Sequence, residues 1–290
     1  MDSLLLTIGL PLALAVIMFG LGLALTLDDF RRVGRQPKPV AVALLVQLAL
    51  LPLLCWGLVS ALRLDPLLAV GMILLAASPG GTTANLFSHL FRGDVALNIT
   101  LTALNSLIAV VTLPLLVNMA VASFDPPGAD DIGLQFGKTV QVFAIVLVPV
   151  ALGMAVRRAA PAFAARADRP VRIASVLGLV GVTTAALLAE RDDIGRYLVD
   201  IGPATVLFCL GSLALGYVIP QLLGVAERQA VSTAFEVGIH NSTLAIAVAI
   251  SVLGNEALAV PAAVYGVLMF PLALVAGLAM RRRSARSPVS

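Results

Sequence analysis

Long apolar runs are the feature of this sequence that most restricts its fold. About nine segments have the length and composition of membrane-spanning helices: 5–27, 40–62, 66–91, 95–123, 140–156, 173–188, 201–223, 231–253 and 258–280. About 20 apolar residues cross the hydrocarbon of a bilayer as a helix. An open sheet edge is excluded there because its backbone groups would have no hydrogen-bond partners. The sequence therefore predicts an all-α polytopic membrane protein with about nine transmembrane helices.

Composition agrees with a membrane protein. Only 12% of the residues are charged, whereas a soluble domain has about 25%. The net charge of +3 gives no indication of a nucleic-acid partner. The first span has no basic segment before it and no small-residue cleavage site, so we expect a retained helix rather than a signal peptide. Cys55 and Cys209 lie inside apolar spans, which predicts buried, inert thiols.

Basic residues set the expected orientation. If the N-terminus lies outside, fifteen of the nineteen Lys and Arg residues fall in loops on the inside. Cytoplasmic loops carry such an excess of positive charge. The sequence therefore predicts a multi-pass protein of the inner (plasma) membrane, with the N-terminus outside and the C-terminus in the cytoplasm.

The loop at 124–139, which contains Pro126, Pro127 and Gly128, divides the chain into two repeats. The first repeat, 1–123, would hold four helices and the second, 140–280, five. A basic cytoplasmic tail, 281–290, would follow. TTAN (82–85) and GIHN (238–241) each place an asparagine just after a helix-breaking stretch. We interpret this as an internal duplication that lacks one N-terminal span of a five-plus-five arrangement.

Glu236 is the one carboxylate placed well inside a predicted span. An unpaired charge in the hydrocarbon costs roughly several kcal/mol, and charged residues at that depth usually have a functional role. We expect Glu236 to bind a cation; the alternatives are a carboxyl kept neutral by burial or one that lines a watery crevice. Its span is loosened by Gly238, and the span 66–91 is broken by Pro79-Gly80-Gly81. Matching breaks in two halves indicate the substrate site of a transporter.

Several oxygen-bearing groups could complete a sodium site, since hard cations prefer several oxygens. Asn98 and Thr102 are four residues apart and share a helix face, and Asn105 and Ser106 continue this polar stripe. The alternative to ion binding, for this stripe and for the buried Gln47, is hydrogen bonding between helices. The further candidate ligands are Gln47, Asn85 and the main-chain carbonyls of Val237 and Ile239.

His240 and the starts of the two half-helices allow other chemistry. Neutral imidazole is a poor sodium ligand, and histidine titrates near physiological pH, so His240 could couple protons or bond between helices. Half-helix N-termini offer unpaired N–H groups and a positive dipole end. Thr82 and Asn241 stand near these starts, where we expect them to bind a substrate carboxylate.

Three strings together resemble bacterial members of the bile acid:sodium symporter family: FGLGLALTLDDF (19–30), SPGGTTANLFSHLFRGDVALNITLTALNSL (78–107) and FEVGIHNSTLA (235–245). The resemblance implies two inverted repeats of five helices, with the first helix missing here. It also implies a core domain (spans two to four and seven to nine) and a panel domain (spans one, five and six). Two broken helices would cross in the core, and substrate would bind between core and panel.

The same resemblance implies two sodium sites. The first would use Asn85, Asn98, Thr102 and Glu236. The second would use Gln47, Glu236, Val237, Ile239 and His240. This chain departs from the family pattern in three places: Ala84 and Asn98 replace serines, and His240 replaces a glutamine. The last change leaves the sodium selectivity of the second site open.

The expected function is a sodium-coupled secondary active transporter that imports an organic anion by alternating access. The anion would be bile-acid-like or a small carboxylate such as pantoate. Two Na⁺ would serve as coupling ions, and no cofactor is expected. The alternatives are a proton-coupled or uncoupled carrier of the same fold, an exporter of a small oxyanion, and a sensor. An enzyme is disfavoured because no nucleophile–base pair or metal-ligand spacing is present. The oligomeric state stays open.

Overall fold

The computed structural model describes residues 10–129, 136–167, 170–171, 173, 177 and 194–284. Within these residues the secondary structure is helical, and the one β-type feature is an isolated bridge between Gly80 and His240. The helices are α2 (Leu10–Ala24), α3 (Leu27–Arg35), α4 (Pro37–Leu45), a π-helix (Val46–Leu50), α5 (Leu51–Ala61), α6 (Pro66–Ala77), α7 (Thr82–Leu90), α8 (Val95–Phe124), α10 (Phe136–Ala159), α12 (Ile194–Leu222), α13 (Glu227–Gly238), α14 (Ser242–Ser251), a 3₁₀-helix (Ala257–Ala259) and α15 (Val260–Ser284).

The predicted all-α membrane architecture is confirmed. Among the described residues, four continuous helical segments are long and apolar enough to cross a bilayer: Pro37–Ala61, Val95–Phe124, Ile201–Leu222 and Ala257–Arg282. Two other predicted spans are each divided into a pair of shorter helices, α6 with α7 and α13 with α14. The predicted span 173–188 lies outside the described residues except for 173 and 177. The total of nine spans and the inverted repeat stay predictions.

The segment after the first span differs from the expected loop. Helix α2 ends at Ala24, and α3 begins three residues later. The backbone N and the Oγ1 of Thr26 both donate to Oδ2 of Asp29, at 2.8 and 2.7 Å. A polar residue that pairs with an acid three positions later is a helix-start signal. Because the pair satisfies orphan donors at the N-terminus of α3, the chain turns and forms a second, amphipathic helix.

The second predicted span is one continuous helical segment with a local widening. Pro37 lies at its start, where the missing N–H of proline costs nothing. Residues Val46–Leu50 form a π-helix between α4 and α5. Such π-type turns inside α-helices often occur at functional sites. Gln47, one of the predicted ligands, lies in this widened turn and is buried.

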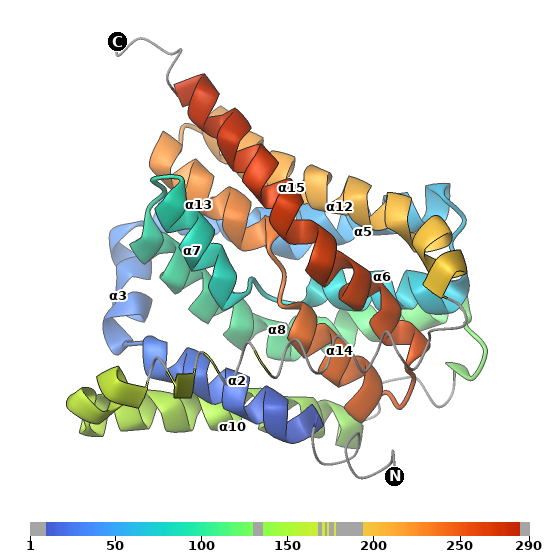
Figure 1. The fold of residues 1–290 in the computed structure, drawn as a ribbon, viewed down its shortest axis with the longest axis horizontal. Helices are drawn as coiled ribbons and strands as arrows, with labels where there is room; N and C mark the ends of the chain where they lie inside the picture. Colours follow the sequence, from blue (N-terminus) through green and yellow to red (C-terminus); the bar gives the residue numbers. More distant parts are fainter. Residues whose placement is uncertain are drawn as a thin grey trace.

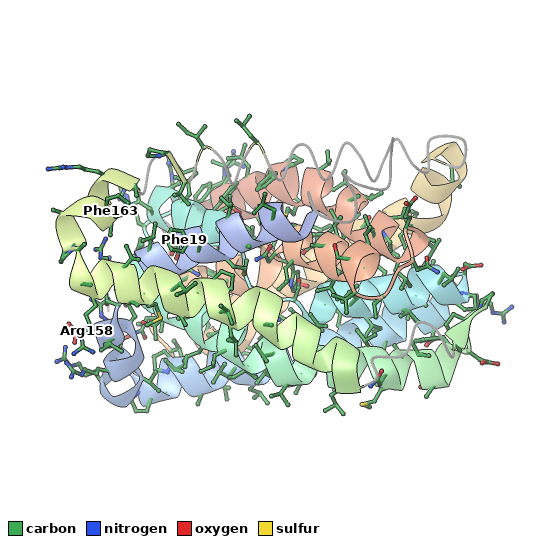
Figure 2. The ribbon with its side chains drawn as sticks, turned by 90° about the horizontal axis from the view of Figure 1, so that it is seen from below. Phe19, Arg158 and Phe163 are labelled. Atoms are coloured by element: carbon green, nitrogen blue, oxygen red, sulfur yellow. The ribbon has the colours of Figure 1, made fainter. Side chains whose placement is uncertain are left out.

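Helices α2 and α10 lie side by side along one face of the molecule (Figures 1 and 2). Their backbones touch because both helices have glycine at the contact. A Cβ added to Gly22 would be 2.9 Å from the carbonyl carbon of Val150, and one added to Gly153 would be 2.8 Å from Cα of Gly22. These helices are the first and fifth predicted spans, which we assigned to the panel. The other panel span falls outside the described residues.

The remaining helices surround the two broken ones. In Figure 1 the α6–α7 pair and the α13–α14 pair run through the body of the molecule, and their breaks meet near its middle. Helix α13 packs against α12, α7 and α8, and α14 packs against α15. The residues from Ala230 to His240 are all buried. The fold therefore places the second break, with Glu236, inside the buried core.

Several basic segments gather at one end of the molecule. Helix α3, the end of α7, the start of α13 and the end of α10 all lie toward the left of Figure 1. Arg158, at the end of α10, is labelled at this end in Figure 2. Nε of Arg228 donates to the carbonyl of Arg92 at 3.3 Å, which joins α13 to the turn after α7. These segments belong to the predicted inside loops. The N-outside orientation itself stays a prediction.

Candidate ion and substrate site at the crossing of two broken helices

The two helix breaks cross and supply each other's backbone hydrogen bonds. The N–H of Gly81 donates to the carbonyl of Ile239 at 2.8 Å, and the N–H of Asn241 donates to the carbonyl of Pro79 at 2.8 Å. Non-helical backbone at membrane depth is tolerated only where the freed groups find such partners. The predicted crossing of the broken helices is therefore confirmed.

Gly80 is the point of closest approach between the two breaks. A Cβ built on Gly80 would lie 2.5 Å from Oε1 of Glu236 and 2.6 Å from the carbonyl oxygen of the same residue. Real Cβ atoms are not found so close to backbone. A Cβ built on Gly81 would meet its nearest atoms at 3.5 Å, which is ordinary contact. Glycine is therefore sterically required at 80 and not at 81.

The carboxyl group of Glu236 is fully buried and accepts three side-chain hydrogen bonds. Nδ2 of Asn98 and Oγ1 of Thr102 donate to Oε2, each at 2.6 Å. Nδ2 of Asn105 donates to Oε1 at 3.0 Å. Only the ionised carboxyl group accepts without donating, and donors of this kind make short, strong bonds to it. The arrangement suits a carboxylate, as expected for a cation ligand.

One face of α8 provides all three donors. Asp94 caps the helix start by accepting from the N–H of Leu97 at 3.0 Å. Asn98, Thr102 and Asn105 follow at spacings of four and three, which places them along one side of a helix. Sequence reasoning placed Asn105 in the polar stripe but left it out of the site. A step of three from Thr102 reaches Asn105 on the same helix face, so the helical period could have included it.

A second polar group forms at the end of α6. Nε2 of Gln47 donates to the carbonyls of Ala76 and Ser78, both at 3.3 Å. Nδ1 of His240 lies 3.2 Å from the same Ser78 oxygen. A carbonyl oxygen only accepts, so Nδ1 carries the proton in this contact. Two residues predicted for the second ion site thus meet at one carbonyl.

The imidazole of His240 is enclosed by aromatic rings. Its ring is stacked on Phe208 with centroids 5.4 Å apart, and Tyr265 approaches edge-on at 5.5 Å. The side chain is 1% exposed. Its Nε2 atom has no hydrogen-bond partner among the described residues. The ring is therefore fixed in orientation while one nitrogen stays available.

Four buried amide oxygens lack hydrogen-bond partners among the described residues: those of Gln47, Asn85, Asn98 and Asn105. Buried polar atoms are nearly always paired, so each exception needs an explanation. Three of the four were predicted cation ligands from sequence. Amide and carboxylate oxygens are what a hard cation takes as ligands. These unpartnered oxygens therefore fit the binding of a cation such as Na⁺ better than they fit a network of hydrogen bonds alone.

The predicted ligands are brought together to different degrees. Asn98, Thr102 and Glu236 are in direct contact, whereas Gln47 and His240 share a carbonyl. Asn85 lies on α7, which packs against both α8 and α13. Its buried oxygen contacts no hydrogen-bond donor in the described chain.

The last carbonyls of α13 have different surroundings. Gly238 O accepts from the hydroxyl of Tyr265 at 2.9 Å, so this carbonyl is directed at α15. The carbonyl of Ile239 faces the first break, where Gly81 binds it. Val237 belongs to the final turn, whose carbonyls have no partner within the helix. Tyr265 thereby fixes the turn that carries the two predicted carbonyl ligands.

The two predicted substrate residues give a mixed result. Asn241 caps α14, since its Oδ1 accepts from the N–H of Leu244 at 3.0 Å. Its acceptor is therefore occupied, and its amide Nδ2 is the group that could contact an anion. Thr82 is the first residue of α7, but its side chain lies outside the part that the structure describes. Both helices begin at the crossing, as expected.

A comparison with protein families matches the first part of the chain, which includes the first break and the polar face of α8. The model of the Sodium Bile acid symporter family matches residues 11–196, which is more than half of the chain. The chain belongs to this family.

Three relatives of this sodium bile acid symporter family member cover most of the chain. A Bacillus subtilis protein named "Uncharacterized sodium-dependent transporter YocS" is 30% identical over 254 residues, which cover 88% of this chain and 77% of that protein. A rice protein named "Probable sodium/metabolite cotransporter BASS2, chloroplastic" is 30% identical over 88% of this chain and 60% of its own length. The human ileal sodium/bile acid cotransporter is 26% identical over 83% of this chain and 69% of its own length. This chain spans less than two thirds of the rice relative. All three relatives are named as transporters or cotransporters.

In this family member, Tyr265→Phe is expected to lower the stability of the folded protein at the crossing of the two broken helices. The change removes the hydroxyl bonded to Gly238 O and keeps the ring contacts with His240. The carbonyl would keep only the weak contact with Sγ of Cys209 at 3.9 Å, and a buried carbonyl without a strong donor costs about 1–3 kcal/mol. Thermal unfolding in choline should therefore occur at a lower temperature, and half-saturating Na⁺ should rise a few-fold.

Ser212→Ala is the matched control, because its hydroxyl is buried but bonds only within α12, to the carbonyl of Phe208 at 2.7 Å. Equal shifts of half-saturating Na⁺ in both variants would show that Tyr265 has no special role at the site.

Proposed function

We propose that the protein is a sodium-coupled symporter that imports an organic anion by alternating access. One observation carries the proposal: a fully buried Glu236 receives three side-chain donors beside a crossing of two broken helices, with unpaired amide oxygens nearby. Intramembrane carboxylates with such surroundings mark ion pathways. The names of the relatives, which include sodium-dependent transporters and cotransporters, support the same reading.

Two cation sites would share the carboxylate. The first would combine Glu236 with Asn98, Thr102 and Asn85. The second would use the carboxylate with the Gln47 oxygen, the carbonyls of Val237 and Ile239, and His240. A hard cation would neutralise the buried charge and use oxygens that otherwise lack partners.

The anion would bind at the starts of α7 and α14. Both half-helices begin at the crossing, so the positive ends of both helix dipoles lie there. Thr82 and the amide Nδ2 of Asn241 would add hydrogen bonds. Because the cations reduce the negative charge of Glu236 close to this place, cation and anion would each raise the other's affinity.

Transport would follow from relative movement of two bodies. The pair α2 and α10, joined through Gly22 and Gly153, would form part of the panel against which the core moves. An inward Na⁺ gradient across the plasma membrane would drive uptake, with the N-terminus outside. The substrate class is an organic anion, bile-acid-like or a small carboxylate such as pantoate.

Uptake into proteoliposomes tests the proposal. Radiolabelled pantoate and a radiolabelled bile salt would be supplied with an inward gradient of Na⁺ or of choline. We expect accumulation of at least one anion with Na⁺ and none above empty liposomes with choline. Equal uptake in both salts would reject sodium coupling.

A proton-coupled carrier of the same fold is the second candidate, favoured by the buried His240 whose Nε2 has no partner in the described chain. The same vesicles, given an inward proton gradient in the absence of Na⁺, would separate the two. Accumulation under that condition would assign the coupling to protons.

A further inference from the structure

The two oxygens of the Glu236 carboxylate have different neighbours. Oε2 is bonded by Asn98 and Thr102. Oε1 is directed at the first break, since a Cβ on Gly80 would lie 2.5 Å from it. Among the described side chains, the hydrogen-bond donor to Oε1 is Asn105, at 3.0 Å. Asn105 therefore lies on the side of the Glu236 carboxylate that faces the crossing.

Asn105 is itself incompletely bonded. Its side chain is 2% exposed, its Nδ2 donates to Oε1, and its Oδ1 has no partner among the described residues. The adjacent Ser106 shows that α8 can satisfy its own polar groups, since its hydroxyl donates to the carbonyl of Thr102 at 2.7 Å. A buried carbonyl oxygen left free next to a carboxylate is unfavourable unless something positive binds there.

The amide group can exchange its two ends at no cost in volume. A half turn about the last side-chain bond swaps Oδ1 and Nδ2, which have nearly the same size. In one orientation Asn105 donates to Oε1. In the other its carbonyl oxygen and Oε1 lie side by side and form a pair of oxygens suited to one cation.

We propose that Asn105 is a further cation-binding residue, which supplies its Oδ1 to the ion at the Oε1 side of Glu236. The inference rests on the proposed sodium coupling and extends it, because it assigns a ligand outside the sites expected from sequence. The amide alternates between donor to the carboxylate and ligand to the cation. Asn105 thereby determines how tightly Na⁺ is held there.

The test is the thermal stability of the full chain in detergent at pH 8, with Na⁺ titrated against choline at constant ionic strength. A cation that binds only the folded protein stabilises it by RT ln(1 + [Na⁺]/Kd), so the rise of the unfolding temperature with Na⁺ concentration gives the concentration at half-saturation. The proteins compared are the wild type, Asn105→Ala, Asn105→Asp and the control Ser106→Ala. For Asn105→Ala we expect half-saturating Na⁺ to rise roughly tenfold or more, as for lost metal-site residues. Ser106→Ala should keep the wild-type value.

Asn105→Asp separates a ligand from a simple hydrogen-bond donor. Aspartate keeps the oxygen and loses the N–H, so a ligand role predicts a Na⁺ response that survives at pH 8. A purely structural donor role predicts that Ala and Asp both lower stability in choline and leave half-saturating Na⁺ unchanged. That second result would overturn the inference while leaving sodium coupling intact. A wild type without any Na⁺ response would overturn both. If Asn105→Ala does not fold, Asn105→Leu, which nearly keeps the side-chain volume and lacks the oxygen, takes its place: a rise in half-saturating Na⁺ supports the ligand role, and an unchanged value rejects it.

Discussion

Glu236→Gln is expected to abolish Na⁺-driven uptake and to remove the stabilisation of the folded protein by Na⁺. The substitution keeps the shape of the side chain and removes its negative charge from a fully buried position. Two unit charges about 4 Å apart attract by about 4 kcal/mol at an effective dielectric constant near 20. Because each 1.4 kcal/mol is about tenfold in affinity, Na⁺ should bind roughly a thousandfold more weakly.

Two measurements check this result: uptake into proteoliposomes under a Na⁺ gradient, and unfolding temperature against Na⁺ concentration in detergent. Glu256→Gln is the control, since Glu256 is a partly exposed carboxylate in the turn before the 3₁₀-helix. It should keep both Na⁺ responses. Half-saturating Na⁺ that is the same in Glu236→Gln and the wild type would remove the carboxylate from the coupling mechanism.

Gly80→Ala is expected to produce the largest structural defect of any single methyl group added at the crossing. The new Cβ would overlap the carboxyl group and the carbonyl oxygen of Glu236. Overpacking of this kind costs about 1–3 kcal/mol in ordinary cores, and here the overlapped atoms include backbone. We expect a clearly lower unfolding temperature together with loss of the Na⁺ response.

Gly81→Ala is the matched comparison one residue away. Its Cβ would meet the backbone of His240 at 3.5 Å and that of Ile239 at 3.6 Å, which is normal packing distance. This variant should fold and bind Na⁺ nearly as the wild type does. The steric account of the crossing fails if the two variants are equally damaged, or if Gly80→Ala is the milder one.

Much of the site could be predicted because membrane sequences make polar residues conspicuous. Glu236 stood out as the single acid deep inside a span, and the matched breaks indicated where backbone groups would be free. The spacing of Asn98 and Thr102 placed them on one helix face, and both now contact Glu236. These inferences needed only local periodicity and the cost of burying charge.

Other features of the site could not be predicted because they depend on contacts between segments that are far apart in the sequence. The sharing of the Ser78 carbonyl by Gln47 and His240 arises only once the breaks cross. The bond from Tyr265 to Gly238 joins α15 to α13, and no motif marks it. The capping pair of Thr26 and Asp29 was present in the sequence as a helix-start signal, yet the stretch was expected to be loop because its charges suggested a cytoplasmic connection.

The paired breaks also determine when each half of the chain can finish folding during synthesis. Gly81 receives its partner carbonyl from Ile239, roughly 160 residues later, and synthesis at about 5–20 residues per second makes that a delay on the order of 10–30 s. During this interval the first break has no native partners, although the bilayer interior offers no substitute for them. The first half therefore cannot mature by itself inside lipid. We therefore expect a chain that stops after α8 to keep these backbone groups unpaired and to be less stable in the membrane than the full chain.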